Sequence, residues 1–294
     1  MALPRRRYVR EGQEGIYHCF SRCVRRAFLY GFDVLTGRDF SHRKQWLVER
    51  LQFLSAIFAI DVCAYAIMEN HYHTILRTRP DIAASWSPLE VATRWLTLFP
   101  RRHMLNETAA AVEEDIRLLA TCPERIAVLR RRLASLSWFM ARLNESVARA
   151  ANKEDDVKGR FWEARFKCQA LLDESAIAAC MVYVDLNPIR AGQAACPEES
   201  NFSSIRERIR TWQKDTAAAA SADQPILSAS PTVSSSWLCP IQSDPERRGI
   251  LPIATLDYFD LVDRSGRMIR SDKKGFIDPE LAPLLLRIGA NPNA

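Results

Sequence analysis

The periodicity of the apolar residues changes along the chain in an order that few folds accommodate. Side chains of a strand alternate between two faces, whereas the apolar residues of an amphipathic helix recur every three or four positions. By these criteria the sequence predicts strands at 16–24, 62–68, 71–77 and 166–172, and helices at 42–58, at 88–151 and from Asp173 to about 186. Glu69 and Asn70 are the predicted hairpin turn between the second and third strands. The elements therefore follow in the order β-α-β-β-α-β, with one further helix after them.

This order is that of the ferredoxin-like, split β-α-β arrangement, so the predicted fold class is α+β. We expect a central antiparallel sheet with helices packed on one face, which leaves the other face free for a ligand. Because a fold does not define a function, the site has to be argued from its residues.

The 294 residues divide at two changes of composition. Residues 1–214 are predicted to form the main domain, with an inserted helical segment at about 80–150. Residues 215–236 are rich in Ala, Ser, Thr and Pro, which predicts a flexible linker. The C-terminal tail at 237–294 is too short to predict a core of its own, and the sequence assigns it no role.

Composition limits the class of protein. Lys and Arg (41) exceed Asp and Glu (35), and the net charge of +6 permits a polyanionic partner. The most apolar segment, 51–68, is interrupted by polar residues, so we expect buried structure there and no membrane span. Eight cysteines without a C-x-x-C pair, and no secretory signal, predict reduced thiols in a cytoplasmic protein.

Two histidines stand at a spacing that suggests chemistry. His71 and His73 are two positions apart on a predicted strand, so their side chains point to the same face. Two adjacent imidazoles can ligate one divalent ion, although a pair of ordinary histidines at the edge of the core has the same spacing. His18 on the first strand has no partner at a telling spacing, and we interpret it as structural.

A tyrosine and an asparagine form the second feature. Tyr183 and Asn187 are four residues apart and share one face of the last helix, which we expect Pro188 to end. Ala176 and Ala179 on this face leave room above the helix. Tyr183 taken alone is typical of an amphipathic core residue. Together with the two histidines it can instead form part of one site.

Together these motifs resemble those of the single-tyrosine HUH transposases, in particular the bacterial REP-associated tyrosine transposases. The resemblance rests on the sequence His71-Tyr72-His73 and on the downstream Tyr-x-x-x-Asn-Pro motif that begins at Tyr183. It extends over residues 8–205 and includes the segments 15–22 (GIYHCFSR), 68–73 (MENHYH) and 159–167 (GRFWEARFK).

The resemblance implies a function and a division of roles. Such enzymes cleave single-stranded DNA, often beside a hairpin, through a covalent 5′-phosphotyrosine. Tyr183 would be the nucleophile, and His71, His73 and Asn187 would be metal ligands. A phenol ionises with a pKa of about 10, so it is a weak nucleophile at neutral pH. A bound Mg²⁺ or Mn²⁺ would compensate for this weakness by polarising the phosphate that the phenol attacks. The interval from His73 to Tyr183 is longer than in compact members of the family, and the helical insertion accounts for the difference.

Basic residues near these motifs are candidates for contact with DNA. Binding of single-stranded DNA requires contacts to phosphates and aromatic stacking with bases. Phe161 and Trp162 could stack, and the cations near them are Lys158, Arg160, Arg165 and Lys167, with Arg190 after the last helix. A solvated charged edge explains each of them equally well. The tail carries five more basic residues in a Gly-containing stretch: Arg264, Arg267, Arg270, Lys273 and Lys274.

The sequence leaves two alternatives to a DNA-nicking and strand-transfer enzyme. One is a domesticated protein that binds hairpin DNA without cutting it, although such a protein has no chemical need for Tyr183 and the histidines. The other is a metal hydrolase that activates water at His71 and His73. The expected partner is single-stranded or hairpin DNA, no membrane is expected, and monomer and homodimer both stay open.

Overall fold

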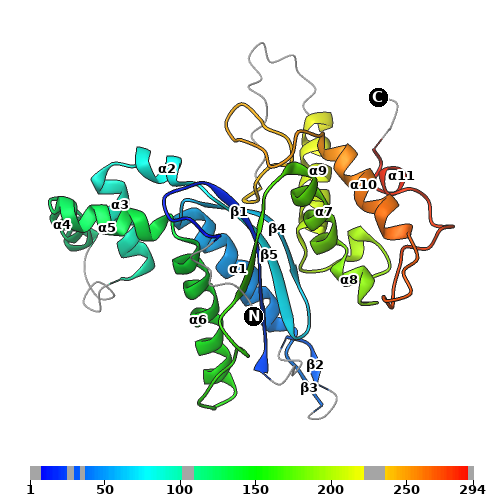
Figure 1. Cartoon of the computed structure of the whole chain (residues 1–294), viewed down its shortest axis with the longest axis horizontal. Coiled ribbons are helices and arrows are strands. Elements are labelled where there is room, and N and C mark those ends of the chain that lie inside the picture. The colour runs from blue at the N-terminus through cyan, green and yellow to red at the C-terminus, as the bar shows by residue number, and fades with distance from the viewer. Residues whose placement is uncertain (1–7, 25–29, 34–36, 101–108, 222–235, 291–294) are drawn as a thin grey trace.

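The computed structural model describes residues 8–24, 30–33, 37–100, 109–221 and 236–290, and the chain has an α+β fold (Figure 1). The strands are β1 (Gly15–Arg22), β2 (Phe32–Asp33), β3 (Arg38–Asp39), β4 (Ile60–Ile67), β5 (His71–Thr78) and β6 (Lys167–Leu171). The helices are α1 (His42–Ile57), α2 (Pro80–Ser85), α3 (Pro88–Leu98), α4 (Ala109–Ala120), α5 (Pro123–Leu133), α6 (Leu136–Glu154), α7 (Glu174–Asp185), α8 (Asn187–Arg190), α9 (Ser204–Ser221), α10 (Thr255–Arg267) and α11 (Leu284–Arg287). Within these described ranges, no helix combines the length and the apolarity needed to cross a membrane.

Four strands form the central sheet in the order β4-β5-β1-β6, and each neighbouring pair is antiparallel. β5 lies between β1 and β4, which is the split β-α-β order that the sequence predicts. The predicted hairpin between β4 and β5 closes with a hydrogen bond from the Met68 N–H to the His71 carbonyl (2.9 Å). The predicted fold class is therefore confirmed.

One face of the sheet is covered by α1 and α6, which pack against each other (Figure 1). Leu51 of α1, Phe139 of α6 and Tyr72 of β5 are fully buried in the same apolar core. The apolar residues of α1 and α6 recur at helical spacing, and those of β5 that face these helices occupy every second position. Each element therefore buries one apolar face in the same core. α6 is thus the second helix of the α+β unit.

The helical insertion is shorter and more divided than the sequence predicts. α2 to α5 form a helical lobe at the left of Figure 1, whereas α6 returns to the sheet. The continuous helical region predicted at 88–151 is interrupted because Pro123 begins α5 and Ser135 precedes α6. The insertion therefore comprises α2 to α5, and residues 101–108 of the predicted segment lie outside the described residues.

The second face of the sheet is partly covered, so the prediction of a free face is wrong for this part. α7 and α9 lie on β4, and α10 packs on α7. Met181 of α7, Ile205 of α9 and Tyr258 of α10 join Ile75 of β5 in a second apolar core. The apolar residues of the tail need a surface against which to bury, and this face of the sheet provides it.

The domain boundaries change for the same reason. The described part of the tail, 237–290, contributes to the second core, and the Cys239 N–H donates to the Val62 carbonyl of β4 (2.9 Å). The predicted linker at 215–236 begins too early, because α9 continues to Ser221. Alanine has the highest helix propensity, so the Ala-rich start of that segment extends the helix. Residues 222–235 lie outside the described residues.

A buried carboxylate joins three helices of the second face. Asp185, at the end of α7, is fully buried and accepts hydrogen bonds from Ser204 Oγ (2.5 Å), the Ile205 N–H (3.0 Å) and Tyr258 Oη (2.5 Å). Burial raises the pKa of this carboxyl, and its hydrogen bonds oppose the rise. The end of α7 is therefore fixed to α9 and to the tail helix α10.

Tyr258→Phe tests this arrangement. The substitution leaves Oδ2 of Asp185 without its tyrosine donor inside the core, so we expect the free energy of unfolding to fall by about 1–3 kcal/mol. Urea denaturation followed by circular dichroism measures the change. Tyr30→Phe is the matched control, because Tyr30 is also fully buried but its hydroxyl has no hydrogen-bond partner among the described residues. Equal destabilisation by the two substitutions would contradict the assignment.

Candidate functional site

The strand side of the candidate site is built from β1 and β5. The two strands pair in a register that sets Phe20 opposite His73 and Arg22 opposite His71. Tyr72 points into the core under α1 and α6, so His71 and His73 point to the second face, with ring centroids 5.0 Å apart. Their predicted placement on one face is confirmed.

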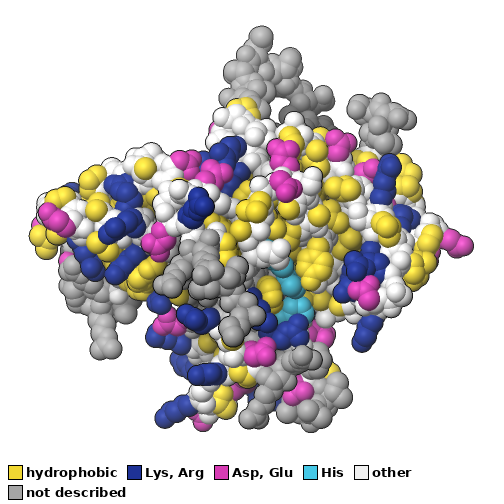
Figure 2. All heavy atoms as spheres, viewed as in Figure 1, with side chains coloured by type: hydrophobic (Ala, Val, Ile, Leu, Met, Phe, Trp, Pro, Cys, Tyr) yellow, Lys and Arg dark blue, Asp and Glu magenta, His cyan; other side chains and the backbone are white. Residues whose placement is uncertain are grey.

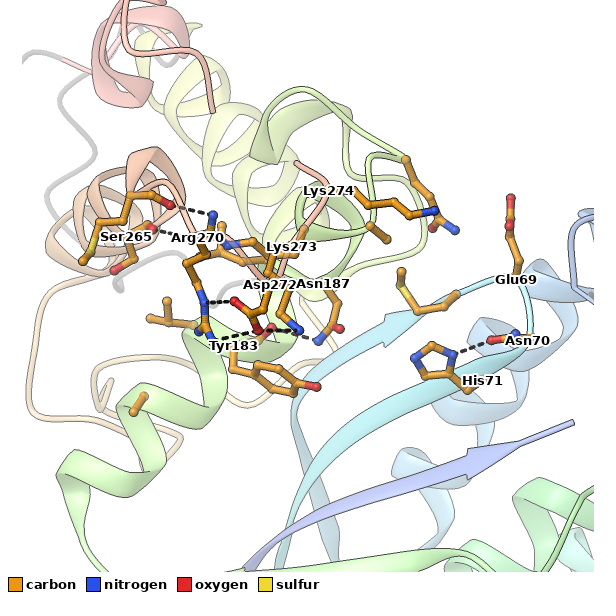
Figure 3. Close-up of a pocket in the computed structure, with 18 of the residues that line it drawn as sticks. Glu69, Asn70, His71, Tyr183, Asn187, Ser265, Arg270, Asp272, Lys273 and Lys274 are labelled. Atoms are coloured by element: carbon orange, nitrogen blue, oxygen red, sulfur yellow. Dashed lines mark hydrogen bonds and ion pairs between the residues drawn. The ribbon is translucent and has the colours of Figure 1, made fainter. Parts of the chain in front are cut away.

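The helix side is built from α7. Its first turn is capped by Asp173, whose carboxylate accepts a hydrogen bond from the Ala176 N–H (2.8 Å). Tyr183 lies opposite the buried Asp185, is 45% exposed, and its ring centroid is 5.6 Å from that of His73. Figure 3 shows the phenol pointing from α7 toward the strand that carries His71.

Asn187 lies one turn after Tyr183, as the four-residue spacing predicts. Its Nδ2 donates to the Tyr183 carbonyl (2.9 Å), which leaves Oδ1 as the acceptor atom of the side chain. Pro188 does not end the helical course at this point: α7 ends at Asp185, and Pro188 lies in the first turn of α8, where its missing N–H costs nothing.

These elements enclose a cavity of about 660 Å³. His71, Tyr183 and Asn187 line it, and His73 is nearly buried behind them, with 6% of its surface exposed. The structure therefore brings the four residues predicted for catalysis and metal binding to one place.

The sequence did not reveal that His18 has a partner in this cluster, which is His73. Its Nε2 lies 2.9 Å from Nδ1 of His73 in a buried hydrogen bond, and its ring centroid is 6.0 Å from that of Tyr183. Period-two alternation puts His18 on the same face of β1 as Phe20, but only the register between β1 and β5 brings it to His73. The interpretation of His18 as a structural residue is therefore incomplete.

All three imidazoles have lowered pKa values. Burial lowers the pKa of His18 to about 4, and burial together with the nearby Arg22 lowers that of His71 to about 4. Burial also lowers the pKa of His73 well below its ordinary value, helped by the other two rings. The rings are thus neutral at neutral pH, which is the form that ligates a metal ion.

The hydrogen bonds select the ring nitrogen that can bind a cation. Nδ1 of His71 is 2.7 Å from Oδ1 of Asn70, which can only accept, so Nδ1 donates and Nε2 carries the lone pair. Nδ1 of His73 is also engaged, by its hydrogen bond with Nε2 of His18 (2.9 Å), in which either nitrogen can be the donor. Ligating histidines commonly have the other nitrogen held by such a partner. Together with Oδ1 of Asn187, which lines the same cavity as His71, the imidazoles supply nitrogen and oxygen donors of the kinds that a divalent cation accepts.

The wider surroundings add no acidic ligand cluster. Among the residues that the structure describes, no group of three or more His, Cys, Asp or Glu side chains is arranged to hold a metal ion. A cation at this site would depend on the two imidazoles and the amide.

The basic residues predicted to contact DNA separate into two sets. Arg165 and Lys167 line a second cavity of about 530 Å³ with Phe20 and Arg22, and Nζ of Lys167 is 5.6 Å from the centroid of the Phe20 ring. Lys158 and Arg160 are exposed but line neither cavity. Figure 2 shows histidine side chains reaching the surface in this region, with Lys and Arg side chains on both sides of them.

Arg190 has a structural task that the sequence does not reveal. It lines the first cavity, but its guanidinium donates to the carbonyls of Ser265 (2.7 Å), Met268 (2.7 Å) and Gly275 (3.3 Å). These bonds attach the C-terminal segment to α8, immediately after Asn187. Contact of Arg190 with DNA stays a prediction.

Comparison with known proteins gives one similar solved structure, a REP-associated tyrosine transposase bound to a REP hairpin. The alignment covers 83% of this chain and 100% of the other, with 15% sequence identity and a TM-score of 0.36. No family model and no curated protein sequence matches the chain. A likeness at this level assigns no role to any residue.

The buried histidines predict a pH-dependent stability. Since the folded pKa of His18 lies near 4 and that of an unfolded histidine near 6.5, the unfolded state binds more protons between these values. The free energy of unfolding should therefore fall as the pH drops from 6.5 to about 4, by up to about 3 kcal/mol for a shift of this size.

Urea denaturation in the presence of a chelator at several pH values measures this dependence. His18→Gln has no titrating ring, so its free energy of unfolding should change less with pH over this range. An identical pH dependence in the variant and the wild-type protein would show that His18 does not titrate as its burial requires.

Proposed function

We propose that the chain is a transposase-like DNA endonuclease and strand-transferase of the single-tyrosine HUH type, with Tyr183 as its nucleophile. The observation that carries the proposal is the edge-to-face contact of the Tyr183 ring with the ring of His73 (centroids 5.6 Å apart) beside a cavity lined by Tyr183, His71 and Asn187. An exposed phenol beside two neutral imidazoles is unusual for a structural tyrosine, which would be buried.

The chemistry follows from the position of the phenol. Oη of Tyr183 attacks the phosphorus of a phosphodiester, the new O–P bond forms, and the bond from phosphorus to the 3′ oxygen breaks. The phenol proton passes to solvent, and the departing 3′ oxygen takes up a proton. The product is a 5′-phosphotyrosine and a free 3′-OH. No water is consumed, so a second 3′-OH can reverse the step and join another strand.

His71, His73 and Asn187 are proposed to hold Mg²⁺ or Mn²⁺ through Nε2, Nε2 and Oδ1. When bound, such a cation polarises the scissile phosphate and offsets the charge that develops on its oxygens. Asn70 holds His71 in the tautomer whose Nε2 carries the lone pair, and His18 orients the ring of His73 through its Nδ1. Asn187 in turn is oriented by its bond to the Tyr183 carbonyl, so nucleophile and ligand are positioned together.

The proposed substrate is single-stranded DNA, probed best as a strand flanked by a hairpin. Phe20 beside Lys167 and Arg165 offers a ring for base stacking and cations for phosphates, the combination that single strands require. The similar solved structure is bound to a hairpin. Monomer and homodimer both fit the proposal.

The alternative is a protein that binds hairpin DNA and no longer cuts it. A hydrolase that uses water at the same histidines is a third candidate, and it leaves the exposed Tyr183 without a task. A denaturing gel of protein mixed with labelled hairpin-flanked oligonucleotide and Mn²⁺ separates the three. A covalent adduct supports the proposal, cleavage without an adduct supports the hydrolase, and binding alone supports the non-cleaving protein.

Tyr183→Phe removes the attacking oxygen and keeps the ring on the helix. We expect the covalent adduct and the cleavage to disappear, while the fold and the affinity for DNA are retained, because Asp185 and Val184 are buried and cannot replace the phenol. The measurements are the denaturing gel and fluorescence anisotropy. Tyr30→Phe is the control and should form the adduct normally. Nicking by Tyr183→Phe at the wild-type rate would show that the nucleophile is water or another residue.

His71→Ala and His73→Ala should each weaken metal binding. Each substitution removes one imidazole from a small donor set, so the affinity for Mn²⁺ should fall by about tenfold or more, and residual cleavage should require more metal. Isothermal titration calorimetry with Mn²⁺ measures binding independently of activity. His42→Ala is the control, because His42 lies at the start of α1 outside the site and pairs with Glu154. Unchanged affinity in both site variants would remove the histidines from the ligand set.

A further inference from the structure

The C-terminal segment 268–275 forms one wall of the cavity at Tyr183, although it is far from Tyr183 in sequence. Arg270, Asp272, Lys273 and Lys274 line the cavity together with His71 and Asn187. Figure 3 shows Arg270, Asp272 and Lys273 grouped beside Tyr183, across the cavity from His71. The site is therefore completed by residues of the tail, which we call the tail wall (268–275).

The five basic residues at 264–274 of the tail have different contacts. Arg267 is bound to Asp263 and to carbonyls of the segment that follows, so it stabilises the fold. Arg264 pairs with Asp260 on the outer surface of α10 and does not line the cavity. Arg270, Lys273 and Lys274 line the cavity and are exposed.

The tail wall is held in place by Arg190, which both donates hydrogen bonds to it and accepts hydrogen bonds from it. The guanidinium of Arg190 donates to carbonyls at both ends of the segment, and the Arg190 carbonyl accepts from the Lys274 N–H (3.2 Å) and the Gly275 N–H (3.4 Å). A Cβ at Gly275 would overlap the Ile189 carbonyl, so this close approach requires glycine. The wall is thus attached to α8, next to Asn187.

The charge of the wall exceeds what its own acidic residue neutralises. Asp272 takes a bidentate pair from Arg270 (3.0 and 3.2 Å) and lies 3.5 Å from Nζ of Lys273. Lys274 adds a further cation at the cavity. One carboxylate therefore faces three cations on the same segment, an excess that attracts an anionic ligand.

A second observation indicates that this ligand is a polymer. Arg22 of β1 lines both this cavity and the second cavity, where Arg165 and Lys167 lie beside Phe20. Basic residues therefore recur along the path from Lys167, through Arg22, past His71 and Tyr183, to the tail wall, and they outnumber the carboxylates of Glu163, Glu69 and Asp272 that line the same two cavities. A small anion would occupy one point of this path, whereas successive phosphates of one strand can follow its whole length.

We propose that the tail wall is a phosphate-binding subsite that holds the backbone of single-stranded DNA beside the scissile phosphodiester. Lys273 and Lys274 contact phosphates on one side of Tyr183, and Arg165 and Lys167 contact those on the other side. The inference rests on the proposed function for the identity of the strand. It adds the segment 268–275 of the tail to the DNA-binding surface.

The test is a double substitution, Lys273→Ala with Lys274→Ala, introduced into the Tyr183→Phe protein so that no cleavage intervenes. The probe is fluorescein-labelled oligothymidylate, and its affinity is measured by anisotropy over a series of salt concentrations. We expect an affinity loss of about fivefold for each lysine at low salt. The slope of log affinity against log salt should flatten by about 0.7 for each phosphate contact removed.

Arg264→Ala in the same background is the matched control, because Arg264 is an exposed cation of the same tail outside the cavity. It should leave the slope unchanged, which excludes a general effect of net charge. Gly275→Ala provides a second variant, since it displaces the wall without removing a charge, and it should weaken binding while the salt slope falls as in the lysine variant. A slope that is unchanged in the lysine variant, or equally flattened by Arg264→Ala, overturns the inference.

The outcome can be distinguished from a failure of the proposed function. The anisotropy experiment does not depend on Tyr183, so a flattened slope supports the tail wall even when the wild-type protein forms no covalent adduct. An adduct together with an unchanged slope would preserve the proposed function and remove the subsite.

Discussion

The position of the candidate nucleophile depends on the buried carboxylate of Asp185. A carboxylate inside a protein is costly unless donors surround it, and each bond to a charged acceptor contributes about 1.5–3 kcal/mol. Asp185 obtains two of its donors from α9 and the third from α10, so the docking of the tail helix completes the set of bonds that holds the end of α7. Tyr183 lies two residues earlier on the opposite side of α7. The contact that stabilises the core thereby also directs the phenol toward the histidines.

The site is composite, and its parts come from distant stretches of the chain. β1 and β5 supply the imidazoles, α7 and α8 supply Tyr183 and Asn187, and the segment 268–275 closes the cavity. Arg190 links the last two parts, because its guanidinium binds carbonyls of the tail one turn after Asn187. The tail is therefore part of both the second core and the candidate site, and a change in its packing would reach both.

The electrostatics of the two sides of the cavity differ in origin. On the strand side, burial keeps the histidines neutral, so they offer lone pairs to a cation. On the helix and tail side, exposed cations are held at the rim, where they are suited to phosphate oxygens. Neutral donors next to a positive rim fit a phosphodiester that is bound by its oxygens while its phosphorus is approached by a phenol.

The amino-acid sequence by itself determined the order of the elements and the local faces. Period-two spacing placed His71 and His73 together, and the four-residue step placed Asn187 beside Tyr183, because both relations are fixed within one strand or one helical course. Only the tertiary structure decided the contact of His18 with His73, the return of α6 to the sheet, and the docking of the tail. These depend on strand register and on which apolar surfaces meet, and neither is encoded in local periodicity.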